Sequence, residues 1–161
     1  MKKKCHRWEP ISGIVGPAAD ISFSYAGRDL GTVTLHFSRV KGLPSEDLSL
    51  HFTHLVALRW ELECPGFDPT PENLPKCISP KWSGWTFPLL EIENSSWLDQ
   101  YAPTYIHPNG PSLSHFLLVS MNDLVQIIAC SDVKSEWVAP LEDTTKNAEP
   151  AHSANPRNAG G

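Results

Sequence analysis

The stretch SHFLLVSMNDLVQIIACSD, from Ser114 to Asp132, decides the fold. Two apolar runs flank Asn122 and Asp123, residue types that favour tight turns, so the stretch predicts a β-hairpin. Side chains alternate between the two faces of a strand. They would fall into two sets: Phe116, Leu118, Val125, Ile127 and Ala129 on one face, and Leu117, Val119 and Ile128 on the other. Because both sets are apolar, we expect a central element that is covered on both sides.

The position of the turn also predicts which residues of the hairpin lie opposite each other. With Asn122 and Asp123 in the turn, Met121 would oppose Leu124, Leu117 would oppose Ile128, and His115 would oppose Cys130. The last pair has the residue types of a cysteine–histidine nucleophile. Aliphatic neighbours surround both residues, however, and this favours a buried, inert thiol.

Alternation of apolar and polar residues predicts further strands on either side of the hairpin. They are Asp20 to Ala26, GTVTLHFSRV at 31–40, one long half-buried strand from His51 to Cys64, and Leu89 to Glu93. A helical turn should follow the last of these, with an N-cap at residues 94–96 and with Trp97 and Tyr101 on one face.

Residues 65–87 contain five prolines, which exclude a helix or a central strand and predict an extended connection. We therefore predict a β-rich α+β fold, with a mostly antiparallel sheet of about five to seven strands and one or two short helices. The alternative is an all-β sandwich.

A length of 161 residues is typical of one domain. We expect a flexible basic arm at 1–9, a single β-rich domain at 10–138, and a disordered tail at 139–161 that is rich in Pro, Ala and Asn. The basic first residues precede no apolar run of the kind that signal peptides or membrane helices need, so we expect a cytoplasmic protein. In that compartment the four cysteines should be reduced, although Cys64 and Cys77 bracket the Pro-rich connection and a bridge between them is conceivable.

The expected domain is acidic. Residues 10–138 hold 7 Lys and Arg against 14 Asp and Glu, a balance of −7, whereas the whole chain has −5. Such a domain should repel nucleic acid and attract a partner with a basic surface. The alternative is that the charge serves solubility alone.

Two Glu-x-Glu pairs are the strongest candidates for chemistry. Glu61 with Glu63, and Glu91 with Glu93, would each place two carboxylates on one face of a strand, about 7 Å apart. That spacing suits a hard cation or an acid and a base, but it is also the usual pattern of a solvated strand face. If the two strands were neighbours, their carboxylates would repel one another unless a basic partner or a metal neutralised them. We therefore predict a partner-binding surface of Glu61, Glu63, Glu91 and Glu93, joined by Trp82 and Trp85 of the Pro-rich connection.

The sequence gives no support to a catalytic, metal or cofactor site. His51 and His54 are three residues apart, which places them on opposite faces of a strand, and His36 is isolated. The phosphate-binding, nucleophile-elbow and HExxH motifs are absent. We therefore expect a binding protein rather than an enzyme, with no catalytic residue, no metal ligand and no cofactor.

The runs WTFPLLEIENSSWLDQY (85–101) and HFLLVSMNDLVQIIA (115–129) carry a resemblance. They resemble small uncharacterised bacterial cytosolic proteins, some of which stand beside polymorphic or contact-dependent toxins as immunity proteins. The resemblance covers about residues 85–130 and includes no catalytic signature. It implies a protein that works by binding a partner, such as a basic toxin domain that an acidic surface would block.

Two functions follow from the sequence. The first is a protein-binding module, of the kind that an immunity-type inhibitor of a basic toxin would be. The second is a small-ligand or metal-binding β-domain, with or without enzymatic activity, which would use the Glu-x-Glu pairs with His36, His51 and His54.

Overall fold

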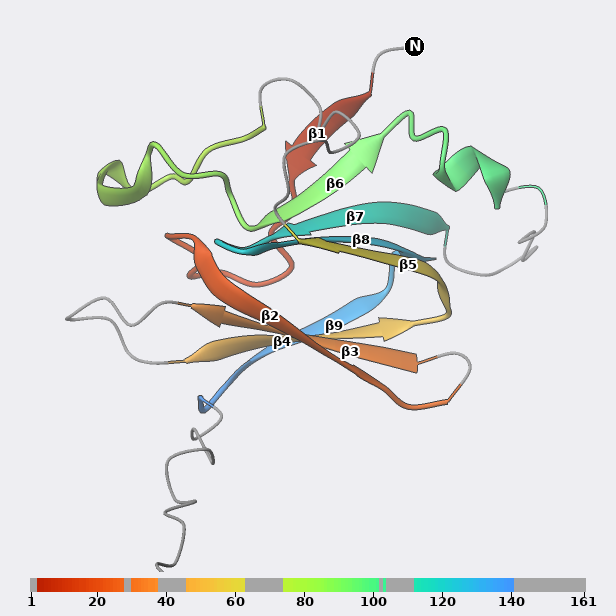
Figure 1. The fold of residues 1–161 in the computed structure, drawn as a ribbon, viewed down its shortest axis with the longest axis horizontal. Coiled ribbons are helices and arrows are strands. Elements are labelled where there is room, and N and C mark those ends of the chain that lie inside the picture. Colours follow the sequence, from red (N-terminus) through yellow and green to blue (C-terminus); the bar gives the residue numbers. More distant parts are fainter. Residues whose placement is uncertain are drawn as a thin grey trace, which may run out of the picture.

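Two antiparallel sheets lie face to face in the computed structural model of the chain, which describes residues 3–27, 30–37, 46–62, 74–101, 103 and 112–140 (Figure 1). The five-stranded sheet has the order β1-β6-β7-β8-β5 and the four-stranded sheet has the order β2-β3-β4-β9. The strands are β1 (Lys4–Arg7), β2 (Ala18–Tyr25), β3 (Leu30–Phe37), β4 (Asp47–Thr53), β5 (Leu55–Leu62), β6 (Leu89–Glu93), β7 (Leu113–Val119), β8 (Asp123–Cys130) and β9 (Val133–Val138). The prediction of a β-rich fold is confirmed, and its sandwich form matches the stated alternative.

The core lies between the sheets. Phe116 of β7 packs edge-on against Phe52 of β4, with ring centroids 5.4 Å apart, and the Trp8 ring contacts Phe116 at a tilt, with centroids 4.4 Å apart. The predicted division of the hairpin into two faces holds, because Phe116 and Ile127 face the other sheet while Leu117 and Ile128 are also buried, on the opposite side. The hairpin is therefore covered on both faces, as its composition requires.

The segment after β6 supplies part of that second cover. It contains the 3-10 helix η2 (Leu98–Gln100), where the sequence predicts a helical turn. The Ser95 hydroxyl accepts a hydrogen bond from the Leu98 N–H at 3.1 Å, so Ser95 caps the turn, and Trp97 contacts Tyr101 with centroids 6.3 Å apart. A second 3-10 helix, η1 (Pro80–Trp82), lies in the Pro-rich connection. The described part of the chain holds no helix with the length and apolarity that a membrane span requires.

The predicted register of the hairpin is wrong by two residues. His115 pairs with Ile128, Leu117 with Gln126 and Val119 with Leu124. The cause is Ser120, whose hydroxyl accepts hydrogen bonds from the N–H groups of Asn122 (3.2 Å) and Asp123 (2.9 Å) and so moves the turn one residue toward the N-terminus. A slip of two residues leaves each side chain on its predicted face but separates His115 from Cys130.

The predicted long strand from His51 to Cys64 is two strands. The chain breaks at His54, which has φ of 51°, a backbone region that ends a regular strand. β4 then belongs to one sheet and β5 to the other. This division is one reason why the described residues form nine strands, more than the predicted number.

The N-terminal segment, where the sequence predicts a flexible arm, contains a strand. Lys4–Arg7 form β1, an edge strand that pairs with β6. Arg7 extends over the Phe87 ring at 5.4 Å and donates a hydrogen bond to the Lys76 carbonyl. The part of the predicted tail from residue 141 onward lies outside the described residues.

Candidate functional site

The predicted carboxylate surface is not contiguous. Glu91 and Glu93 lie on β6 and Glu61 lies on β5, and strands β7 and β8 stand between them. Glu91 pairs with Phe116, which faces the other sheet, whereas Glu61 pairs with Leu124 on the opposite side of the hairpin. Strand pairing therefore separates the two pairs by distance and by face. Glu63 lies outside the described residues.

Two of the described carboxylates, Glu61 and Glu93, have basic side chains as neighbours. Glu93 lies 3.1 Å from Nε2 of His6 on β1, and Glu61 lies 3.5 Å from Nε of Arg59 on its own strand. Both pairs are at least partly exposed, so each contributes little to stability. Glu61 and Glu93 therefore each have a basic side chain within this chain beside them.

The two tryptophans of the Pro-rich connection do lie together. The Trp82 and Trp85 rings meet edge to face, with centroids 6.3 Å apart. Trp82 is half-buried against Gly16, and the Lys81 ammonium lies 5.2 Å from its centroid. Trp85 remains 42% exposed. Of these two predicted residues, Trp85 is the one that a partner could reach.

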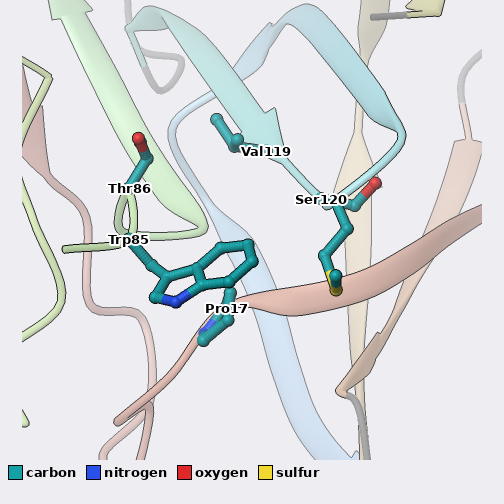
Figure 2. Close-up of a pocket in the computed structure, with 6 residues that line it drawn as sticks. Pro17, Trp85, Thr86, Val119 and Ser120 are labelled. Carbon is teal, nitrogen blue, oxygen red and sulfur yellow. The ribbon is translucent and has the colours of Figure 1, made fainter. Parts of the chain in front are cut away.

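Trp85 borders a small pocket of about 150 Å³ (Figure 2). The residues that line it are Pro17, Trp85, Thr86, Val119, Ser120 and Met121. Figure 2 shows the Trp85 indole extending toward Pro17, with Val119 and Ser120 approaching from the hairpin. Met121 is 43% exposed and, with Trp85, gives the pocket two of the larger exposed apolar side chains of the described surface.

Backbone hydrogen bonds bring three distant segments together at this pocket. The Met121 N–H donates to the Ala18 carbonyl at 3.0 Å, which joins the hairpin turn to the first residue of β2. The Val119 N–H donates to the Pro88 carbonyl at 2.8 Å, which joins the hairpin to the end of the Pro-rich connection. The pocket therefore lies where both sheets and the connection meet, and no single stretch of sequence predicts it.

The turn between β7 and β8 also carries polar and aromatic groups around the pocket. The Asn122 side-chain amide donates to Asp20 at 3.1 Å, which fixes an exposed carboxylate beside Met121. On the other side of the turn, the Trp60 indole N–H donates to the Asp123 carboxylate at 2.9 Å, and Trp60 is 39% exposed. The turn is therefore flanked by two exposed tryptophans, Trp60 and Trp85.

A second polar cluster covers the outer face of the four-stranded sheet. His36 Nδ1 lies 2.7 Å from Asp47 Oδ2, and His36 Nε2 lies 3.2 Å from Ser22 Oγ. On the same face, His51 of β4 makes similar contacts. Its Nε2 lies 2.9 Å from Glu136, and its Nδ1 lies 3.1 Å from Thr32. The alternation in the sequence places Ser22 and His36 on polar strand faces. It does not predict that His36 contacts Asp47 on the neighbouring strand β4.

His115 is buried within a hydrogen-bond chain on the covered face of the five-stranded sheet. Its Nε2 lies 3.1 Å from Gln126 Oε1 and its Nδ1 lies 2.6 Å from the Ser95 hydroxyl. The Trp97 ring packs edge-on against the imidazole at 5.0 Å. Burial, with the charges of Lys3 and Arg59 adding to it, lowers the pKa of His115 to about 4. His115 is therefore a neutral structural group at physiological pH.

The thiols have the character of structural groups as well. Cys5 and Cys77 are free thiols, and burial raises the pKa of both. Burial also raises the pKa of Cys130. A raised pKa lowers the thiolate fraction and with it the reactivity. Cys64, the other half of the conceivable bridge, lies outside the described residues.

Within the described ranges, no group of three or more His, Cys, Asp or Glu is placed to hold a metal ion. Comparison with known proteins found no match among protein-family models, curated proteins or solved structures.

Proposed function

We propose that this protein is a protein-binding module whose partner has a basic surface, as the target of an immunity-type inhibitor would have. The observation that carries the proposal is the pocket between Trp85 and Met121, at the junction of the two sheets. Tryptophan is among the residues that most often dominate binding energy at protein interfaces. Trp85 is exposed beside a cavity, which is the arrangement that a partner side chain can use.

The size of the pocket limits what can enter it. A volume of about 150 Å³ is comparable to engineered cavities that hold a benzene-sized group. One aliphatic or phenyl side chain of the partner would fit between Trp85, Val119 and Met121. The pocket would then anchor one residue, while the surrounding turn supplies the remaining contacts.

Charge supports a basic partner. The residues from 10 to 138 carry a balance of −7, which would accelerate encounter with a basic surface. Asp20, held beside Met121 by Asn122, can accept a Lys or Arg next to the anchored side chain. The recognition surface is thus Trp85, Met121, Trp60 and Asp20 around the turn, rather than the Glu-x-Glu strands; Glu61, Glu91 and Glu93 contribute to the long-range field.

The test uses the protein encoded by the reading frame next to that of this chain, purified and titrated by calorimetry. Replacing Trp85 by Ala should weaken binding by about 2 kcal/mol or more, roughly 30-fold in Kd, because the anchor wall of the pocket is lost. Replacing Met121 by Glu should weaken binding further, because a charge would then enter the apolar pocket.

Tyr25→Ala is the matched control. Tyr25 is an aromatic residue with 56% exposure at the far end of β2, so its loss should leave Kd unchanged. Equal affinity of the Trp85→Ala variant and the wild type would remove the pocket from the interface. Absence of binding to that neighbour would overturn its assignment as the partner.

A further inference from the structure

Ser22, His36 and Asp47 form a hydrogen-bonded chain across three adjacent strands. Ser22 lies on β2, His36 on β3 and Asp47 on β4. The distances are 3.2 Å from Ser22 Oγ to His36 Nε2 and 2.7 Å from His36 Nδ1 to Asp47 Oδ2. In the register, Ser22 pairs with Thr34 and Asp20 with His36, so the hydroxyl and the imidazole are diagonal neighbours on one face of the sheet.

The two ring nitrogens of His36 have different partners, and this determines which of them carries the hydrogen. An ionised carboxylate only accepts hydrogen bonds, so a short contact to Asp47 places the hydrogen of a neutral His36 on Nδ1. Nε2 is then left as an acceptor for the Ser22 hydroxyl hydrogen. Serine hydrolases use the same assignment to make serine a nucleophile. The Asp47 side chain is only 6% exposed and His36 is 26% exposed, so the carboxylate is shielded while the imidazole is accessible.

The position of Ser22 on an edge strand supplies a second element of such a site. The Ala26 N–H donates to the Leu30 carbonyl, which makes 26 and 30 a hydrogen-bonded pair of the β2–β3 ladder. Hydrogen-bonded pairs alternate along an antiparallel ladder, so Ser22 directs its own N–H toward β3, while Ile21 and Phe23 direct theirs away. β2 ends the sheet, and among the described residues no strand pairs with it at Ile21 or Phe23. The Phe23 N–H, next to the hydroxyl, can therefore donate to an oxyanion.

The other histidine chain on this face lacks these features. Thr32, His51 and Glu136 are also linked, at 3.1 Å and 2.9 Å, but the Glu136 side chain is 60% exposed. Ser49 Oγ also lies 3.2 Å from His51 Nε2, the nitrogen that contacts Glu136. Thr32 lies on β3, which has a paired strand on each side, so the ladder uses its neighbouring N–H groups. This chain serves as an internal comparison.

We propose that Ser22 is the nucleophile of an acyl-transfer site, with His36 as its general base. Ser22 Oγ attacks the carbonyl carbon of a small activated ester, and its proton moves to His36 Nε2. The Phe23 N–H stabilises the resulting oxyanion, the bond to the leaving oxygen breaks, and His36 returns the proton to that oxygen. Water then hydrolyses the acyl-Ser22 ester by the same route. Asp47 is a positioning residue that holds the imidazole.

The substrate class follows from the shape of this face. Ser22 and His36 are partly exposed on the face of a sheet, so the site would accept a compact acyl group or an ester carried on an extended chain along the β2 edge. The proposal goes beyond partner binding and does not depend on it, because none of Ser22, His36 and Asp47 lines the Trp85 pocket.

The experiment uses the full chain and a small alkyl fluorophosphonate, which phosphonylates activated serines. Peptide mass spectrometry should find one adduct, on Ser22, and the Ser22→Ala variant should show none. His36→Gln should lower the labelling rate about 100-fold, which is the lower range of general-base catalysis. Asp47→Asn should lower it as well, because the imidazole loses the acceptor that fixes its tautomer. Hydrolysis of p-nitrophenyl acetate should follow the same order.

Ser24→Ala and Thr32→Ala are the matched controls. Ser24 shares the face and strand of Ser22, and Thr32 contacts His51, so both variants should label at the wild-type rate. Thermal unfolding of each variant verifies its fold; if His36→Gln does not fold, Asp47→Asn carries the test. Absence of a Ser22 adduct, equal labelling of several hydroxyls, or a labelling rate that neither variant lowers would overturn the proposal.

Discussion

At the scale of single residues, His115 is a buried group whose protonation would affect the fold. Its ring meets the Ser95 hydroxyl at 2.6 Å and Gln126 at 3.1 Å within an apolar sheet face. Gln126 Oε1 accepts from Nε2–H, and Nδ1 accepts from the Ser95 hydroxyl. If Nδ1 were protonated, its N–H and the Ser95 O–H would point at each other. The Ser95 O–H would then have to rotate away from the ring. The neutral form therefore holds the η2 segment on the sheet.

This arrangement predicts a loss of stability in acid. The pKa of His115 is about 4 in the fold, below its ordinary value of 6.5, so the unfolded chain binds a proton at a higher pH than the native state does. The contribution is complete above pH 6.5 and is lost as the pH falls toward 4. At pH 4.5 it should lower the free energy of unfolding by about 2 to 3 kcal/mol relative to pH 7.

Urea unfolding of the wild type and of His115→Gln at both pH values measures the effect. The glutamine variant should be less stable at pH 7, because the packing against Trp97 changes, and it should lack this part of the pH dependence. The same difference between pH 7 and pH 4.5 in both proteins would mean that His115 does not control it.

At the scale of elements, one close contact helps to position the Pro-rich connection. A Cβ at Gly16 would lie 2.9 Å from both Cδ1 and Nε1 of Trp82, so only glycine allows the indole to approach the chain before β2. Trp82 in turn meets Trp85 edge to face. The position of the pocket wall thus depends on a residue that has no side chain.

Replacing Gly16 by Ala should displace Trp82 and destabilise the domain by about 1 to 3 kcal/mol, as overpacking of tight contacts does. Near-ultraviolet circular dichroism and urea unfolding would record the change. Gly84→Ala is the control, because nothing lies within 4 Å of a Cβ at Gly84 in the same segment. If both variants kept the wild-type spectrum and midpoint, the contact with Trp82 would not be needed.

The sequence predicts the individual strands better than it predicts how the strands are arranged. Leu89–Glu93 is found as predicted because its flanking residues end the strand at both sides. The division into β4 and β5 was not predicted. The residues on both sides of His54 follow a strand-like apolar pattern, and the positive φ of His54 leaves no mark in that pattern. The same limit applies to the sites. Ser22, His36 and Asp47, or Pro17, Trp85 and Met121, meet only through strand order, which local patterns do not encode.

At the scale of the whole molecule, charge and surface shape act together. The acidic residues behind the balance of −7 lie on both faces of the five-stranded sheet, since Glu61 and the β6 carboxylates lie on different faces. A field of this kind steers encounter without fixing an orientation. Orientation would come from the Trp85 pocket and from the one carboxylate, Asp20, that a hydrogen bond holds beside it.

Asp20→Asn should therefore slow association with the basic partner several-fold at about 50 mM salt, and high salt should reduce the difference. Stopped-flow measurement of the association rate at low and high salt provides the test. Glu46→Gln is matched to it, because it removes the same charge from another exposed position. Equal slowing by both variants would show that net charge alone governs encounter.

The pairing of β1 with β6 has a consequence for synthesis. Lys4 lies opposite Glu93, so β1 has no partner until β6 follows it from the ribosome, roughly 5 to 20 seconds later at ordinary translation rates. Lys4, His6 and Arg7 are exposed in the finished strand, and their charge would discourage β1 from pairing with another chain in that interval. β4 likewise waits for β9, the last strand of the sandwich. The four-stranded sheet is therefore complete only once β9 has been synthesised.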